Sequence, residues 1–237
     1  KYGAIISVAD KIETLISIFI SGKRPSGSSD PYALRRNLNG VVKIMWNFEL
    51  DFSIENLFEE LIEYWKTSLP NLNFIQKKVF EDLIEFLFQR IESHLEEIAI
   101  DKELIKAICS SDEFFKKRIL NIKDLKNRIE AISVYKEKGS FDKIQKIITR
   151  VSKLADSGNL KKDILSKEGY INQELFEKES ELKVFKFINE LEDLSAKDDL
   201  NYLKILNMFE INTKNLEELF DNEKGVLIMS EDSKIRE

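Results

Sequence analysis

The sequence has few of the residues that interrupt helices, cross-link a chain or bind metals. Its 237 residues include 3 prolines and 8 glycines, so long uninterrupted elements are expected, and these favour helices over a turn-rich β fold. The single cysteine, Cys109, excludes an intramolecular disulfide and fits a buried thiol in a reducing compartment such as the cytoplasm. With one histidine, His94, the chain has no zinc motif of Cys and His ligands.

The chain also lacks a long apolar run and an excess of positive charge. Its most apolar stretch, residues 4–20, is interrupted by Asp10, Lys11 and Glu13, so we expect a core helix and no membrane partner. The net charge is −6 at pH 7. Proteins that hold nucleic acid by their overall charge are usually basic, so any RNA site here must be a local cationic patch.

Amphipathic periodicity is abundant, and it predicts an all-α fold made of many helices. Hydrophobic residues make up 43% of the chain, enough for a sizeable core. In the first half, helices are expected at 4–20, at 31–49 with a break near Asn39–Gly40, at 54–69 with Ser53 as N-cap, at 73–99, and at 101–110. Residues 21–31 are the clearest loop, after which Asp30 would cap a helix that begins with Pro31.

The second half continues in the same way. Helices are expected at 113–136 after an Asp112 cap, and at 141–155, 175–194, 198–209 and 213–221. Gly139 and Ser140 separate two of these helices, and residues 156–174 are expected to form a loop. Residues 225–229 (GVLIM) form a short apolar run that fits a strand or a buried turn of helix.

Two motifs at the ends of the chain are more specific. From residue 9 the sequence reads ADKIETL, then a hydrophobic run, then GKRPSGSSDPYALRR up to residue 36. From residue 219 it reads LFDNEKGVLIMSEDSKIRE. Both resemble stretches of the bacterial glycyl-tRNA synthetase β subunit, and ITRVSKLA at 148–155 is similar to a helix of the same family. The matching positions in the first motif are Ala9–Lys11, Thr14, Leu15, Gly22, Pro25, Gly27, Ser28, Asp30, Pro31 and Ala33–Arg36.

The resemblance implies a domain order and a role. Residues 1–69 would be the end of an HD-like domain, 70–124 a connecting helical region, and 125–237 a DALR-type anticodon-binding domain whose last helices are missing. The chain begins without Met and stops in a helix-like pattern, so we expect a fragment. In the family, two α and two β subunits form a cytoplasmic tetramer. The α subunit uses ATP and Mg to activate glycine, whereas the β subunit holds tRNA(Gly). No cofactor or catalytic residue is expected in this part.

The RNA-binding candidates are cations, because phosphates are held by Lys and Arg and unstacked bases by Arg or aromatic planes. The best cluster, without an interleaved carboxylate, lies on one side of the predicted helix 141–155 and consists of Lys143, Lys146, Arg150 and Lys153. A second cluster, in the motif at residues 22–36, consists of Lys23, Arg24, Arg35 and Arg36. The remaining candidates are Arg118 and Arg128 in the centre of the chain, beside Lys116 and Lys117, and Arg236 near its end. Each cluster could instead be a solvated helix face, and Arg35 and Arg36 could pair with neighbouring carboxylates.

Three alternative functions stay open on the sequence alone. One is an anticodon-binding module of another aminoacyl-tRNA synthetase, which would lack the motif at residues 22–36. Another is an HD-type phosphohydrolase, in which Asp10 would be a metal ligand; however, the matching histidines are absent, so Asp10 is expected to form a helix salt bridge or cap. We expect His94 to be a polar surface residue among Glu92, Ser93 and Glu96. The third is a helical scaffold that binds only proteins.

Overall fold

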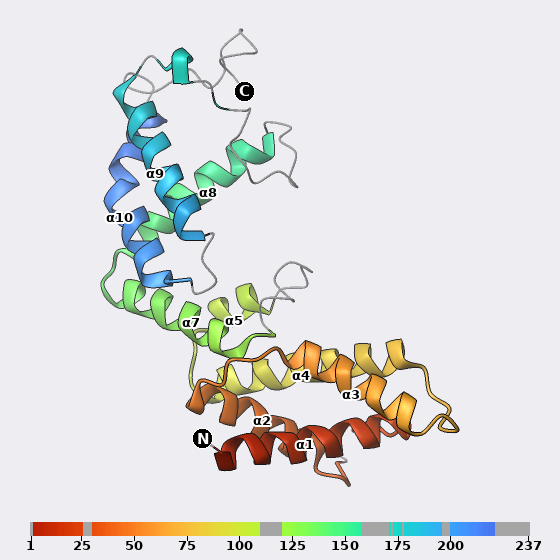
Figure 1. The fold of residues 1–237 in the computed structure, drawn as a ribbon. Coiled ribbons are helices and arrows are strands. Elements are labelled where there is room, and N and C mark those ends of the chain that lie inside the picture. Colours follow the sequence, from red (N-terminus) through yellow and green to blue (C-terminus); the bar gives the residue numbers. More distant parts are fainter. Residues whose placement is uncertain are drawn as a thin grey trace. The chain divides into compact units, whose positions relative to one another are not determined.

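The computed structural model describes residues 2–25, 30–109, 120–157, 171, 173–176, 178–195 and 200–220. Every regular element in these ranges is helical, which confirms the predicted all-α class (Figure 1). None of the helices described there is long and apolar enough to cross a membrane. The elements are α1 (Tyr2–Ile20), α2 (Leu34–Phe48), α3 (Ile54–Ser68), α4 (Gln76–Glu97), α5 (Lys102–Ile108), α7 (Ile122–Glu137), α8 (Phe141–Ser157), the 3-10 turn η1 (Gln173–Leu175), α9 (Glu179–Ser195) and α10 (Tyr202–Leu219).

The chain divides into two compact units, residues 1–127 and 128–237, which we call the N-terminal and the C-terminal unit. The division falls inside α7, so the first turns of that helix belong to one unit and its remainder to the other. The assignment of an HD-like remnant to residues 1–69, a connecting region to 70–124 and a DALR-type domain to 125–237 stays a prediction.

The core of the N-terminal unit is formed by four helices. α1 packs along α2, and α4 packs against both α2 and α3. Their buried side chains recur at helical spacing, and each contributes roughly 1.5–3 kcal/mol by leaving water. The fully buried ones include Ile12, Leu15, Ile16, Phe19, Leu38, Val41, Val42, Met45, Phe58, Leu83, Leu87, Ile91 and Leu95.

Two features of α2 differ from the sequence expectation. The helix begins at Leu34, three residues later than expected, because Pro31 and Tyr32 form a turn and Ala33 adopts a left-handed conformation (φ 53°). Asp30 still caps the helix, since its carboxylate accepts the backbone N–H groups of Leu34 (2.7 Å) and Arg35 (3.1 Å).

The break that we expected near Asn39–Gly40 does not occur, because Gly40 lies in an unbroken α2 against α1. A Cβ at this position would lie 3.1 Å from Cε of Lys11. The glycine therefore marks a close approach of two helices rather than a helix end.

α3 begins at the N-cap predicted for it, whereas α5 begins at an N-cap, Asp101, that was not predicted. Ser53 accepts the backbone N–H of Asn56 at 3.2 Å, as predicted, and α3 ends just before Leu69. Asp101 accepts the N–H groups of Glu103 and Leu104, both at 3.0 Å, and so begins α5.

The first turns of α7 are tied to the segment between α2 and α3. Lys123 Nζ lies 2.8 Å from Asp51, and Lys126 Nζ lies 2.7 Å from Glu49. The single helix that we expected at 113–136 is wrong, because Leu120 is in a turn and Asn121 caps α7 by accepting the N–H of Asp124 at 3.0 Å. The Asp112 cap lies outside the described residues.

The C-terminal unit is built on α8, α9 and α10, with α10 packed against both of the others. The buried cluster consists of Ile147, Val184, Phe187, Leu194, Met208 and Leu216, and the rings of Phe187 and Phe209 meet edge to face at 5.2 Å. Gly139, at φ 72°, provides the left-handed residue between α7 and α8.

The two helices that we expected at 198–209 and 213–221 form one continuous helix, α10. Asn212 and Thr213 lie where the first predicted helix was to end and the second to begin, but their side chains bond back to the carbonyls of Met208 (2.9 Å) and Phe209 (2.8 Å) within the helix. The apolar run at 225–229 lies outside the described residues.

Candidate nucleic-acid interface

A stripe of cations runs along α8, which we call the α8 stripe: Lys143, Lys146, Arg150 and Lys153. All four side chains are exposed, and their spacing of three, four and three residues places them on one side of the helix. The neighbouring side is buried through Ile144 and Ile147. The stripe spans about 15 Å along the helix axis at 1.5 Å per residue. The helix is thus held by its apolar side and presents the cations to solvent.

The lysines of the α8 stripe are not neutralised within the part of the chain that the structure describes. Asp142 lies one turn before Lys146, but no ion pair joins them, and Lys143 and Lys153 have none either. Cations on a helix that have no carboxylate partners are suited to binding a polyanion. When the polyanion binds, the lysines release solvent counterions and do not have to break ion pairs within the protein.

Arg150 differs from the three lysines because it is engaged inside the unit. Its Nη2 donates to the carbonyl oxygen of Phe220 at 2.9 Å, and its Cζ lies 5.0 Å from the centre of the Phe220 ring. A cation bound to a carbonyl at the end of α10 is favourable because that end carries negative dipole charge. Arg150 thus joins α8 to the end of α10 while remaining exposed.

The motif cluster is divided by the structure into engaged and exposed cations. Arg24 donates through Nε (2.9 Å) and Nη2 (2.6 Å) to the same carboxylate oxygen of Asp82, and through Nη1 to the carbonyl of Phe19 (2.6 Å). Lys23 is exposed and lies over the ring of Tyr32, whose hydroxyl it also contacts. Arg24 therefore fastens the loop after α1 to α4.

The other two arginines of the motif lie in the first turn of α2. Arg35 is half-buried and Arg36 is exposed. The structure adds one arginine that the sequence interpretation missed, Arg90 of α4, whose Nε is buried without a hydrogen-bond partner. Burial, and then repulsion by Arg35, holds the pKa of Arg90 below its usual value. The signal in the sequence was an arginine one turn after Phe86, on the apolar side of an amphipathic helix.

The remaining candidates are less informative. Arg128 is half-buried in α7. Arg118 and Arg236 lie outside the described residues, as do Lys116 and Lys117. The assignment of all these cations to tRNA stays a prediction.

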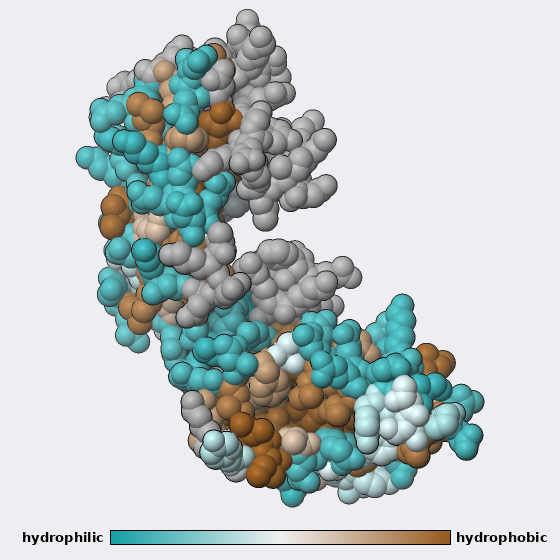
Figure 2. Space-filling model, in the orientation of Figure 1, coloured by the Kyte–Doolittle hydropathy of each residue, from teal (hydrophilic) through white to brown (hydrophobic). Residues whose placement is uncertain are grey.

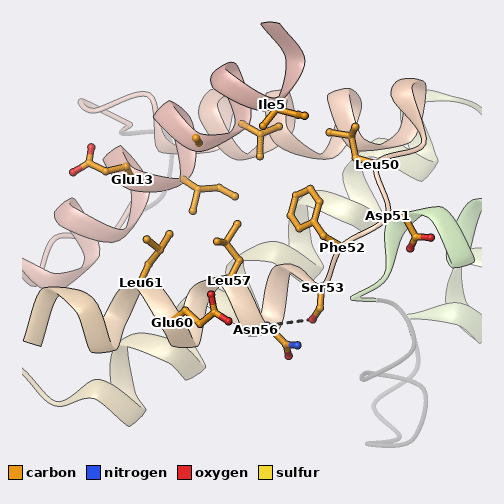
Figure 3. A pocket seen from close by; sticks show the side chains of 13 residues that line it. Ile5, Glu13, Leu50, Asp51, Phe52, Ser53, Asn56, Leu57, Glu60 and Leu61 are labelled. Carbon is orange, nitrogen blue, oxygen red and sulfur yellow. Dashed lines mark hydrogen bonds between the residues drawn. The ribbon is translucent and has the colours of Figure 1, made fainter. Parts of the chain in front are cut away.

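A groove of about 840 Å³ opens between α1 and residues 50–61 (Figure 3). Its lining is mainly apolar, and Phe52 and Leu57 lie on either side of its centre in the close view. Three carboxylates, those of Glu13, Asp51 and Glu60, also line it. Carboxylates repel phosphate, so this groove does not suit a nucleic acid.

The surface beside the groove is also apolar. Figure 2 shows hydrophobic residues gathered around the N-terminal end of α1, where Ile5 is 52% and Ile6 69% exposed. A patch of this kind is typical of a surface that contacts protein.

Asp10 of α1 is exposed, and the salt bridge or cap expected for it is not formed with any described residue. Within the described ranges, no group of His, Cys, Asp and Glu side chains is arranged to hold a metal ion.

His94 is buried, so the prediction that it lies on the polar surface is wrong. The side chain is 6% exposed and meets the ring of Trp46 edge to face, with 5.2 Å between ring centres. Neither ring nitrogen has a hydrogen-bond partner among the residues that the structure describes. Burial lowers the pKa of His94, although Glu97 raises it and Lys43 lowers it further. His94 is therefore a neutral core residue between α2 and α4.

The fold and the charge distribution define an all-helical protein whose exposed cations gather on particular helix faces of an acidic chain. Residues 1–110 match the family model described as glycyl-tRNA synthetase beta subunit. The chain is 32% identical, over 99% of its length, to the glycine–tRNA ligase beta subunit of Picosynechococcus sp., of which it covers 33%. Its identity to the same subunit of Trichodesmium erythraeum is 33%, with 99% of the chain and 33% of the relative covered.

A third relative gives the same result. The glycine–tRNA ligase beta subunit of Thermodesulfovibrio yellowstonii is 32% identical over 99% of the chain, which covers 31% of that relative. The chain is thus related to the glycyl-tRNA synthetase β subunits along nearly its whole length, which confirms the resemblance found in the sequence. It spans about a third of the length of these curated relatives.

Proposed function

We propose that this chain is a tRNA-binding part of the β subunit of glycine–tRNA ligase. In this proposal it positions tRNA(Gly) for glycylation by the α subunit, within a cytoplasmic tetramer of two α and two β subunits. The α subunit uses ATP and Mg to activate glycine, and this chain binds the tRNA without taking part in the reaction. The relatives support the ligase assignment by their names. The observation that carries RNA binding is the α8 stripe, in which Lys143, Lys146 and Lys153 are exposed and form no ion pair with any residue that the structure describes.

Binding of this kind works by placing the RNA. Each lysine that neutralises a phosphate releases a counterion, so the affinity falls steeply as the salt concentration rises. In a plot of the logarithm of the binding constant against the logarithm of the salt concentration, each contact to a single strand adds about 0.7 to the steepness of the slope. Contacts to unstacked anticodon bases would add selectivity, because a mismatched polar group left unpaired costs on the order of 1–3 kcal/mol. The acidic body keeps nonspecific binding low, which leaves the local stripe to set the register of the tRNA.

The test measures binding of tRNA(Gly), and of a tRNA with a changed anticodon, across a salt series. We expect a preference for tRNA(Gly) and a slope that becomes shallower by about 2 when Lys143, Lys146 and Lys153 are all replaced by Gln. A matched control replaces Lys183, Lys186 and Lys204, three exposed lysines of α9 and α10 in the same unit, and should leave the slope unchanged.

The outcomes separate the alternatives. Binding without any anticodon preference would contradict anticodon reading, and equal slopes for the two triple variants would move the RNA site away from α8. A second candidate function, a scaffold that binds protein, is favoured by the apolar groove beside α1. Failure to bind any tRNA at low salt would support the scaffold instead. A preference for the tRNA of another amino acid would point to a module of a different synthetase.

A further inference from the structure

The groove beside α1 is a trough between two neighbouring helices. α1 packs chiefly against α2, and α3 chiefly against α4, so the sides of α1 and α3 that face each other are only partly filled. The lining residues recur at spacings of three and four within 5–13 of α1 and 56–61 of α3, so each helix presents one continuous side to the groove (Figure 3). Residues 5–13 extend for about 12 Å, slightly more than two turns of helix.

The floor and walls of the groove are apolar. Val8 and Ile12 are 3% and 0% exposed, so they lie at its floor, whereas Phe52 and Leu57 are half-buried. Ile5 also lines the groove and is 52% exposed. A partner that covered these side chains would remove them from water, which is the main favourable contribution in most protein–protein association.

Among the described residues that line the groove, the charged ones are all acidic. Glu13 comes from α1 and Glu60 from α3; both are exposed, and neither forms an ion pair with any residue that the structure describes. Asp51 is paired with Lys123 at 2.8 Å. In Figure 3, Glu13 and Asp51 lie toward opposite ends of the groove, with Leu57 between them. The groove therefore combines an apolar middle with carboxylates that no described cation neutralises.

We propose that the groove binds an amphipathic helix of a partner protein, whose apolar side enters between α1 and α3 and whose lysines or arginines meet Glu13 and Glu60. A helix with apolar residues at i, i+3, i+4 and i+7 fits an apolar groove of this kind. The two carboxylates select a basic helix over an acidic one, because like charges facing each other across an interface repel. The proposal does not depend on tRNA binding, so either can fail without the other.

The test uses synthetic helical peptides and measures their binding to this chain by fluorescence anisotropy. The probe peptide carries Leu at i, i+3, i+4 and i+7 and Lys beside them, in an Ala-rich sequence of about 18 residues that favours helix. In one comparison peptide Glu replaces every Lys, and in the other Ser replaces every Leu. We expect the Leu/Lys peptide to bind roughly tenfold more tightly than either, because each of the others lacks one of the two contributions.

Variants of the chain test whether the peptide lies in the groove. Ile5→Ser removes an exposed apolar side chain from the lining and should weaken binding of the Leu/Lys peptide by roughly fivefold. Glu13→Lys combined with Glu60→Lys should weaken it by on the order of tenfold, and by less at high salt. Trp46 and Trp65 both lie in the N-terminal unit, so their fluorescence during urea unfolding shows that the variants fold.

The matched controls change residues outside the lining. Ile211→Ser removes an apolar side chain that is 66% exposed on α10, and Glu59→Lys combined with Glu85→Lys reverses two exposed charges of α3 and α4. Both controls should bind the Leu/Lys peptide as the wild type does. The proposal is overturned if the groove variants bind this peptide like the controls, or if the Leu/Glu peptide binds as tightly as the Leu/Lys peptide.

Analytical ultracentrifugation of the chain alone tests the other possible occupant, a second copy of the chain. A concentration-dependent dimer that Ile5→Ser abolishes would assign the groove to the second copy and overturn the proposal. A monomer at the same concentrations, together with one-to-one binding of the Leu/Lys peptide, supports it.

Discussion

Arg24 and Asp82 join the loop after α1 to the first half of α4, because Nε and Nη2 of the arginine both donate to one carboxylate oxygen. The two side chains are 29% and 31% exposed, so solvent screens the pair in part. The same guanidinium also donates to the carbonyl of Phe19 and lies over the Phe19 ring. The arginine therefore contributes through packing and hydrogen bonds as much as through charge.

We expect Arg24→Gln to lower the free energy of unfolding of the N-terminal unit by about 1–2 kcal/mol. Urea denaturation followed by tryptophan fluorescence measures the change. In a double-mutant cycle, Asp82→Asn should have less effect in the Arg24→Gln background than in wild type. Strict additivity of the two substitutions would show that the pair does not interact in solution.

The stability of the N-terminal unit should depend on pH through His94. Its folded pKa is lowered by burial, whereas the unfolded chain titrates near 6.5. The unfolded state thus binds more protons, so stability is fully present above pH 6.5 and is lost as pH falls toward the folded pKa. Each unit of lowering corresponds to about 1.4 kcal/mol at low pH.

The measurement compares wild type with His94→Leu between pH 7.5 and 5.5, using urea unfolding followed by tryptophan fluorescence. The wild type should lose stability over this interval relative to the variant. Carboxylates other than Glu97, whose pKa is lowered in part by His94, contribute equally to both proteins, so the difference reports on the histidine and its interaction with Glu97. Parallel pH profiles would mean that His94 is hydrated in solution.

Cys109 should react slowly with alkylating reagents. Burial, and to a lesser degree Glu92, raises the pKa of its thiol to about 11. At pH 8 the thiolate fraction is then on the order of a hundredfold below that of an ordinary cysteine. Iodoacetamide labelling followed by mass spectrometry should therefore be slow in the native protein and fast in urea. Native labelling at the rate of a small free thiol would contradict the partial burial of Cys109.

Removing the cap of α3 should weaken the N-terminal unit. Ser53→Ala leaves the N–H of Asn56 without its partner and should cost about 1 kcal/mol of unfolding free energy. Ser93→Ala is the matched control and should be close to neutral, because this serine inside α4 forms no side-chain hydrogen bond with any described residue. Equal effects of the two substitutions would argue that the cap is not formed in solution.

Much of the fold was predictable because the relevant interactions are local. The N-cap at Ser53, the stop after Ser68 and the left-handed Gly139 each depend on residues within one or two turns. The errors arose where tertiary packing overrides local preference. Asn212 and Thr213 favour helix ends, yet α10 continues through them because its buried Met208 and Leu216 pack in the core.

The sequence predicted which cations belong to the candidate site, but it could not predict which of them form contacts with other side chains of the protein. Spacing alone placed Lys143, Lys146 and Lys153 on one face of a helix. It could not show that Arg24 pairs with Asp82, since the two residues are separated by 58 positions. For the same reason His94, whose ring meets Trp46 of another helix, looked like a surface residue.

The α8 stripe has a consequence for how this protein can change over evolutionary time. Its lysines face solvent while Ile144 and Ile147 of the same helix hold the unit together. Substitutions of exposed residues usually alter stability by less than about 0.5 kcal/mol. Affinity for a polyanion can therefore be raised or lowered by exchanging lysines one at a time, without a penalty to the fold that would oppose selection.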